Sequence, residues 1–306
     1  MLKLTVLKRK SNIALTLGII VILLLLPMWY IALVPFMIAS EIEKTDVTTS
    51  YEGKLYYSDY GLGSPKIPIL IEAHVYANET KGDNIILKIE ANMMNMTEPD
   101  KPNRLDEFSY DLTYVINKFT LKNMQDIPDA DKNRTGYDPL YPMHLKADEE
   151  IPNVWLDNLN VTSTLEYKGS ANEEGLELYK YFVNKTITTE TMLPFGLRNV
   201  TVTSTKTLLI EPLSGVLAYT ENETLTAYMG WKQEKYYLQL VDLTYKSTGE
   251  AKVEGIATAK TTHDALQLLE LYIPTILGVI AIILIAGLGF NIRRLRKEMA
   301  SQAKKS

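Results

Sequence analysis

The chain has no cysteine and only three histidines, His74, His144 and His263. The missing cysteine excludes a disulfide-stapled scaffold, a thiol nucleophile and thiolate-held zinc or iron–sulfur sites. The few histidines have no metal-ligand spacing near them. His74 lies between two apolar residues of an apparent strand, where we expect a structural role. We expect His144 and His263 at the surface.

Charge is missing from two long stretches, Ser11–Ser40 and Tyr272–Ile292. Each is long enough to cross a bilayer, which takes about 20 apolar residues. The first stretch is longer than the core of a signal peptide and has no clear small-x-small cleavage site, so we expect a retained anchor. Trp29 and Tyr30 are expected to mark the outer headgroup level, with an apolar stalk beyond them.

The basic residues of both termini lie outside these spans, whereas residues 41–270 carry 22 Lys and Arg against 36 Asp and Glu. By the positive-inside rule, both termini are expected to be cytoplasmic and the middle extracytoplasmic. A middle region with a net charge of −14 argues against nucleic acid as a partner. The expected division is a basic tail (1–10), a spanning helix and stalk (11–40), a β domain (41–250), a juxtamembrane helix (251–271), a second span (272–292) and a basic tail (293–306).

The middle region is rich in Thr, Val, Ile and Tyr with period-two alternation, which is typical of strands. Gly-, Pro- and Asn-rich turns separate the alternating segments. The pattern predicts a membrane-anchored all-β protein, with a large antiparallel barrel or sandwich between two terminal helices. Strands are expected at Lys66–Ala77, Asn84–Met94, Phe108–Phe119, Leu176–Val183, Thr201–Ile210 and Tyr236–Tyr245.

Seven N-x-T glycosylation triplets lie between the two spans, against about two expected by chance from the Asn, Ser and Thr content. An extracytoplasmic position would expose them to the glycosylation machinery. Glycosylation without cysteine suggests an archaeal cell surface. The candidate sites are Asn78, Asn95, Asn133, Asn160, Asn184, Asn199 and Asn222.

Other motifs are weaker. Asp129, Asp131 and Asn133 begin like a calcium loop, but Arg134 replaces the required Gly and Leu140 the bidentate Glu. We therefore interpret residues 126–142 as a surface loop. The sequence has no nucleophile elbow or phosphate loop, and its acid pairs lie in polar loops. We expect no catalytic, cofactor or metal site, and no enzyme activity.

Several aromatic residues of the middle region are ordinary core candidates. The alternative is that some of them line an apolar cavity, as in barrels that enclose one hydrophobic ligand. The candidates for such a cavity are Tyr141, Trp155, Phe182, Phe195 and Trp231.

Short motifs carry a resemblance to a known family. They are Val154-Trp155-Leu156-Asp157, the segment Gly175–Tyr181, and Glu211-Pro212-Leu213-Ser214-Gly215-Val216. Together with the two-span layout, they resemble the PorA-like envelope proteins, a family of actinobacteria and archaea. The resemblance implies an envelope protein that handles lipids. The layout is also similar to that of class B scavenger receptors, which hold a lipid-conducting β domain between two spans.

Two functions remain open at this stage. The first is a membrane-anchored carrier that binds lipid or glycolipid near the outer leaflet. The second is a glycosylated structural or adhesive protein that contacts the surface layer or other envelope proteins. An internal cavity would distinguish the first from the second.

Overall fold

The computed structural model describes residues 2–59, 62–63, 65–125, 127–128, 130, 132, 134–193, 196–230 and 237–303. The chain forms two compact units. One unit contains residues 1–38 and 264–306, and the other contains residues 39–263.

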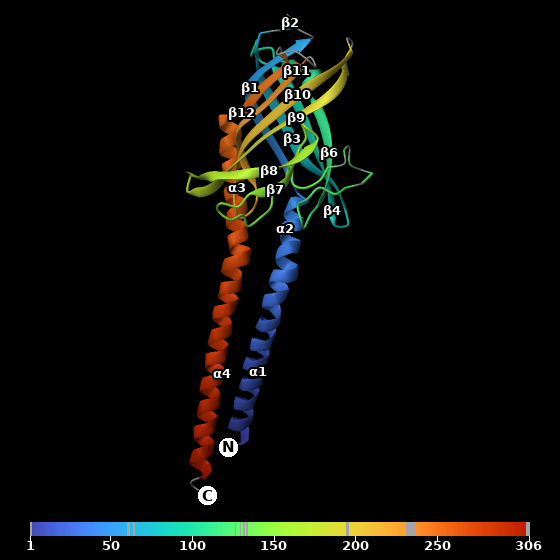
Figure 1. Ribbon diagram of the computed structural model, residues 1–306. Coiled ribbons are helices and arrows are strands. Elements are labelled where there is room, and N and C mark those ends of the chain that lie inside the picture. Colours follow the sequence, from blue (N-terminus) through green and yellow to red (C-terminus); the bar gives the residue numbers. More distant parts are fainter. Residues whose placement is uncertain are drawn as a thin grey trace. The chain divides into compact units, whose positions relative to one another are not determined.

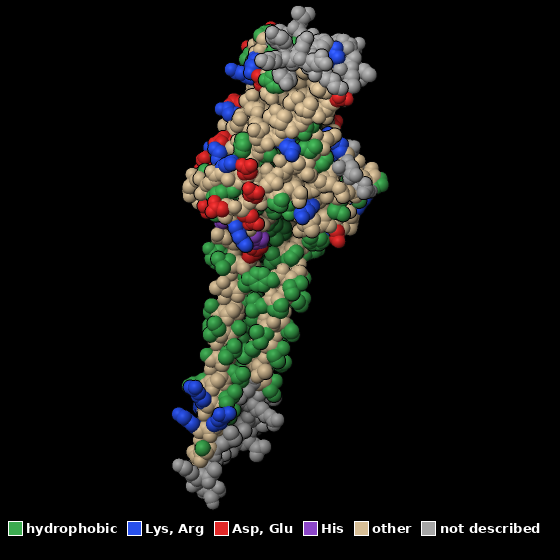
Figure 2. All heavy atoms as spheres, in the orientation of Figure 1, with side chains coloured by type: hydrophobic (Ala, Val, Ile, Leu, Met, Phe, Trp, Pro, Cys, Tyr) green, Lys and Arg blue, Asp and Glu red, His purple; other side chains and the backbone are tan. Residues whose placement is uncertain are grey.

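The first unit pairs the two ends of the chain as long helices (Figure 1). The N-terminal helix runs through α1 (Leu2–Met28), the π-helical turn η1 (Trp29–Leu33) and α2 (Val34–Ile42). The C-terminal helix enters through η3 (Leu268–Tyr272) and continues as α4 (Ile273–Ala303). Both helices are long and apolar enough to cross a membrane. Figure 2 shows hydrophobic side chains along them, and most of these are exposed, as lipid-facing residues would be.

The expected headgroup residues join the two helices. The Trp29 indole Nε1 donates to the Leu269 carbonyl at 2.8 Å, and the Tyr30 hydroxyl donates to the Glu270 carbonyl at 2.8 Å. Both acceptors lie in η3, whose π-helical turn frees carbonyls from the regular ladder. The side chains of Trp29 and Tyr30 therefore hydrogen-bond the two helices to each other at one level.

The second unit is an antiparallel sheet, so the predicted all-β class is confirmed. Ten strands follow the order β5-β4-β3-β1-β12-β11-β10-β9-β8-β7, with β2 paired to β1 and β6 to β4. The strands are β1 (Asp46–Asp59), β2 (Leu62–Gly63), β3 (Ile67–Lys81), β4 (Asn84–Asn95), β5 (Asn103–Arg104), β6 (Tyr110–Asn117), β7 (Ile151–Leu156), β8 (Val161–Glu173), β9 (Leu176–Leu193), β10 (Gly196–Ile210), β11 (Leu217–Gly230) and β12 (Tyr237–Ser247).

The two ends of this sheet are joined by isolated bridges. Ile116 of β6 pairs with Asn123, Asn123 pairs with Gly136, and Tyr137 pairs in parallel with Val154 of β7. The backbone ring therefore closes at this level, as in a barrel, and strand edges are covered there. We call this junction the seam.

Apolar side chains cover the inner face in two main clusters. The first centres on Ile151, Leu165 and Tyr181, and the second on Leu55, Ile69 and Leu243. On the outer face, α3 (Gly249–Gln267) packs Ile256 and Ala259 against β9–β11. The juxtamembrane helix predicted at 251–271 thus corresponds to α3 and the turn after it.

Candidate functional site

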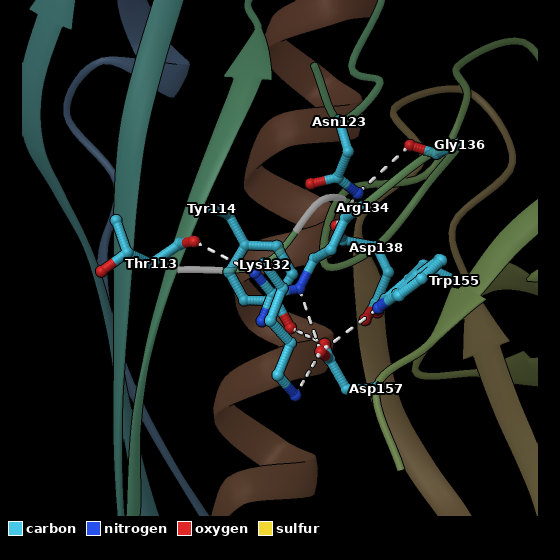
Figure 3. Close-up of polar contacts among 9 residues, drawn as sticks. All are labelled: Thr113, Tyr114, Asn123, Lys132, Arg134, Gly136, Asp138, Trp155 and Asp157. Carbon is cyan, nitrogen blue, oxygen red and sulfur yellow. Dashed lines mark hydrogen bonds and ion pairs between the residues drawn. The ribbon is translucent and has the colours of Figure 1, made fainter. Parts of the chain in front are cut away.

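The seam is held by a buried arginine. Arg134 is 2% exposed, and its Nε donates to Asp157 Oδ1 at 3.0 Å. Its Nη1 donates to the Thr113 carbonyl at 3.1 Å, and its guanidinium lies 4.0 Å from the centre of the Tyr114 ring. Trp155 Nε1 also donates to Asp157 Oδ1, at 3.2 Å. Figure 3 shows these side chains converging on the carboxylate.

Both oxygens of the Asp157 carboxylate have polar partners in this network. The Tyr114 hydroxyl donates to Asp157 Oδ2, and Lys132 Nζ lies 3.6 Å from Oδ1. Burial, together with the charges of Asp138 and Asp157, raises the pKa of Tyr114 well above its usual value, so the phenol stays protonated. A buried arginine that pairs with one carboxylate and stacks on a ring is a structural tie between β6, the 134–137 segment and β7.

This network corrects the expectation that residues 126–142 form a surface loop. Arg134 is among the largest fully buried side chains, and Gly136 adopts a φ of +75° against the carbonyl of Asn153. A Cβ at Gly136 would lie 1.6 Å from that oxygen, so the closure requires glycine. Asp129, Asp131 and Asn133, the calcium candidates, lie outside the described residues.

A second group of polar side chains lies on the inner face of the sheet. In the strand register, Lys206 of β10 is opposite Glu223 of β11, which is opposite Tyr245 of β12. Lys206 Nζ is 3.1 Å from Glu223 Oε1, and the Tyr245 ring makes an edge contact with Tyr51 of β1 at 5.5 Å. Burial alone would lower the pKa of Lys206, but Glu223 and Asp138 raise it overall, so the lysine stays charged.

Asp138 faces the same region. Desolvation and the nearby carboxylates of Asp157 and Glu223 raise its pKa to about 7, although Lys206 and Arg134 oppose the shift. Its backbone carbonyl accepts a hydrogen bond from Asn123 Nδ2 at 2.8 Å. The carboxyl of Asp138 is therefore half protonated near neutral pH.

Tyr110 is an inward-facing residue of β6 that stays exposed to solvent. It has the strand parity of Tyr114, which points inward to Arg134. Tyr110 is nevertheless 48% exposed. The packed core therefore does not enclose this inward side chain, which lies at the first position of β6.

The proposed cavity residues have different locations. Tyr141 is 4% exposed in the first apolar cluster, and Trp155 is 8% exposed at the seam. Phe182 lies on the opposite face of β9 from the buried Tyr181 and stacks under Lys168. Phe195 and Trp231 lie outside the described residues. The structure thus places Tyr141 in the first apolar cluster and Trp155 in the seam network, and it directs Phe182 to the opposite face.

His74 and His263 each lie beside a carboxylate. His74 Nε2 lies 2.7 Å from Asp46 Oδ1, in line with a structural role. His263 Nδ1 lies 2.8 Å from Oε1 of Glu211, a fully buried carboxylate that also accepts the Leu213 and Ser214 backbone N–H groups. The expectation of a plain surface histidine is therefore wrong for His263, which ties α3 to this turn. Among the described residues, no group of three potential ligands could hold a metal.

The glycosylation candidates are accessible where the structure describes them. Asn78, Asn160, Asn184 and Asn222 are exposed, and Asn95 and Asn199 are partly exposed. Asn95 Oδ1 accepts hydrogen bonds from the backbone N–H and the hydroxyl of its own Thr97. Asn133 lies outside the described residues.

The comparison with family models decides the family. The model described as Porin PorA matches residues 12–289, which includes most of both spans and the whole sheet. The chain belongs to the Porin PorA family. No curated protein matches it. Membership of this family supports a role as an envelope protein. The matched residues of this PorA chain include the turn at Glu211, the seam and the inner polar residues.

Sequence reasoning missed the most connected polar residues, Arg134, Asp138, Lys206 and Glu223. One signal was available for Lys206 and Glu223, because each occupies an inward position of an alternating strand. A charged residue in such a position is informative, since buried charges need partners. Arg134 and Asp138 lie in a Pro- and Asp-rich segment, where no periodic pattern distinguishes a buried residue from an exposed one.

Proposed function

We propose that this PorA family member is a two-span envelope protein whose β domain binds membrane lipid or glycolipid reversibly and passes it on without catalysis. The exposed, inward-facing side chain of Tyr110 carries the proposal, because a ligand needs a way into the domain. The apolar clusters on the inner face supply surface for an acyl chain.

The proposed topology places both termini in the cytoplasm and the β domain outside. The support is the location of the basic residues beyond both spans. Protease added to intact cells should spare tags at either end of the chain. Removal of either tag would contradict this topology.

The energetics suit a carrier. Transfer of a chain of about 14 methylenes from water, at about 0.8 kcal/mol each, gains roughly 11 kcal/mol. The bilayer offers the same gain, so exchange between the membrane and the domain is close to neutral. Uptake is therefore expected to be reversible, and selectivity must come from polar contacts.

The absence of cysteine makes a clean test possible. In the full chain in vesicles, Tyr110→Cys can be labelled with a bulky maleimide, and Asp111→Cys serves as the control. Asp111 is the next residue of β6 and faces outward, and both positions are exposed. Labelled Tyr110→Cys should lose most uptake of a fluorescent long-chain lipid, whereas labelled Asp111→Cys should keep it. Equal uptake by both, or no uptake by the unmodified chain, would contradict the carrier function.

The exposed sequons favour a second candidate, a glycosylated structural or adhesive protein of an archaeal surface that contacts the surface layer. Both candidates predict glycans, so the glycans do not separate them. Replacement of Thr80, Thr97 and Thr224 by Ala should lower the apparent mass stepwise. Failure of lipid uptake in the presence of intact glycans would favour the structural function.

A further inference from the structure

The inner polar residues form a group beside the two apolar clusters, which meet at Leu225. Lys206, Glu223 and Tyr245 are neighbours across three strands, and Tyr51 contacts Tyr245. Ser204 lies two residues before Lys206 on the same face of β10. We call these five residues the interior belt. Leu208, two residues beyond Lys206, belongs to the first apolar cluster, and Leu243, two residues before Tyr245, belongs to the second. The belt is therefore a polar zone with apolar surface on either side.

The charges of this region are balanced. Lys206 is 3.1 Å from Glu223, and Arg134 is 3.0 Å from Asp157. Each of these two cations already pairs with a carboxylate. Recognition of a phosphate group requires cationic donors that are not neutralised in this way. A headgroup with a net negative charge would have to compete with Glu223 for Lys206.

Whereas the charges are paired, some hydrogen-bonding groups of the interior belt are not. Within the described chain, Ser204 is fully buried and its Oγ has no hydrogen-bond partner. A buried hydroxyl without a partner is unfavourable, so a polar group or water is expected against it. Glu223 accepts from Lys206, from Asn158 Nδ2 at 3.2 Å and from the Tyr245 hydroxyl, which still does not use every lone pair of its carboxylate. Tyr51 and Tyr245 add phenols that are protonated, since burial raises the pKa of each.

We propose that the interior belt binds a neutral, polyhydroxylated group, such as the sugar head of a membrane glycolipid, through Lys206, Glu223 and Ser204. This inference rests on the proposed carrier function and names its ligand class. Hydroxyl groups both donate and accept, so they can satisfy an ammonium, a carboxylate and a serine hydroxyl together without disturbing the charge balance. The tyrosine rings offer apolar faces to the C–H faces of a sugar and phenol edges to its hydroxyls. The apolar clusters would take the acyl chains.

The test uses the full chain in vesicles with three photoactivatable lipids that share one diazirine-bearing acyl chain. Their heads are a neutral glucosyl group, zwitterionic phosphocholine and anionic phosphoglycerol. After illumination, mass spectrometry separates labelled peptides of β10–β12 from those of the spanning helices, which contact bulk lipid. The glucosyl lipid should label β10–β12 about tenfold more than the anionic lipid, as expected from one or two additional hydrogen bonds.

Matched variants locate the selectivity. Lys206→Met/Glu223→Met removes both members of the inner pair. Lys180→Met/Glu221→Met removes an exposed pair of the same residue types on β9 and β11, the two strands that flank β10. The inner double variant should lose the preference for the glucosyl head, and the outer one should keep it. If Lys206→Met/Glu223→Met does not fold, Lys206→Gln/Glu223→Gln tests the same point. It should retain the preference, because neutral amides still hydrogen-bond hydroxyls.

The outcomes separate this inference from the carrier function. Equal labelling of β10–β12 by all three lipids, or a preference that survives Lys206→Met/Glu223→Met, overturns the belt as a headgroup site and leaves the carrier intact. A Gln pair that folds but loses the preference also overturns it. Labelling of the spanning helices alone overturns both. Competition by free methyl glucoside would support recognition of the sugar itself, and a preference without such competition would support recognition of the sugar as a lipid head.

Discussion

The seam network makes a strong prediction about stability. Arg134→Met keeps the aliphatic volume of the side chain but removes its charge, its bond to Asp157, its bond to the Thr113 carbonyl and its contact with the Tyr114 ring. Because Arg134 is 2% exposed, water cannot replace these contacts, and the Asp157 carboxylate loses its main cationic partner. Breaking a buried pair on one side costs about 3–5 kcal/mol.

The size of the expected shift follows from the size of the domain. For a domain of about 150–250 residues, 1 kcal/mol lowers Tm by about 2–4 °C, so Arg134→Met should lower the Tm of the β domain by roughly 6–20 °C. The assay is thermal unfolding of the full chain in detergent, followed by the circular dichroism of the β domain. Arg134→Met/Asp157→Leu should recover part of the loss, because no charge is then left unpaired.

An exposed pair provides the control. Arg104 Nε lies 2.9 Å from Asp106 Oδ1, with side chains 60% and 85% exposed. Arg104→Met should therefore leave Tm within about 2 °C, since exposed pairs contribute about 0–1 kcal/mol. A shift of under 2 °C for Arg134→Met would refute the seam as a structural tie. Strictly additive losses in the Arg134 and Asp157 variants would refute their coupling.

Three further predictions concern separate parts of the molecule. Asp138 retains its proton to about pH 7 in the folded state, whereas an aspartate in the unfolded chain has the ordinary pKa of 3.8. The folded state then binds more protons than the unfolded state between these two pH values, so the free energy of unfolding should fall by up to about 4 kcal/mol as pH rises from about 4 to about 7. Asp138→Asn should flatten this slope when Tm is measured at four pH values. An unchanged slope would contradict the raised pKa of Asp138. A Cβ at Gly255 would lie 1.9 Å from a backbone carbonyl of β11, whereas Gly249 at the start of the same helix has nothing within 4 Å. Gly255→Ala should cost about 1–3 kcal/mol in unfolding experiments and Gly249→Ala almost nothing, and equal costs would refute close packing of α3 on the sheet. Thr224→Ala should reduce the mass of the native protein by one glycan and Thr226→Ala should not; identical masses would exclude glycosylation at that sequon.

Much of the fold could be predicted because its signals are local. The charge-free runs predict both long helices. Alternation predicts parts of β9 and β10, where Leu176–Val183 lies within Leu176–Leu193 and Thr201–Ile210 lies within Gly196–Ile210. The predicted strand at Asn84–Met94 matches β4 to within one residue. Such periodic patterns depend only on neighbours in the sequence. Strands β1 and β11 carry polar residues on both faces, so alternation does not predict them.

The candidate site could not be predicted in the same way, because it depends on register and closure. Lys206 and Glu223 are inward neighbours only because β10 and β11 pair in this register, and a slip of one residue would turn one of them outward. Arg134 is buried only because two distant sheet ends meet at the seam. The sequence shows neither relationship.

The central claim is that the interior of the β domain holds a membrane lipid. Native mass spectrometry of the full chain, purified from its own membrane and freed of detergent in the gas phase, measures this most directly. We expect a mass above that of the glycosylated polypeptide by one lipid molecule. This lipid should be released intact on collisional activation, and it should be absent from Tyr110→Cys carrying a bulky maleimide. A chain that retains no lipid, or one whose bound lipid is unaffected by that label, would contradict the claim.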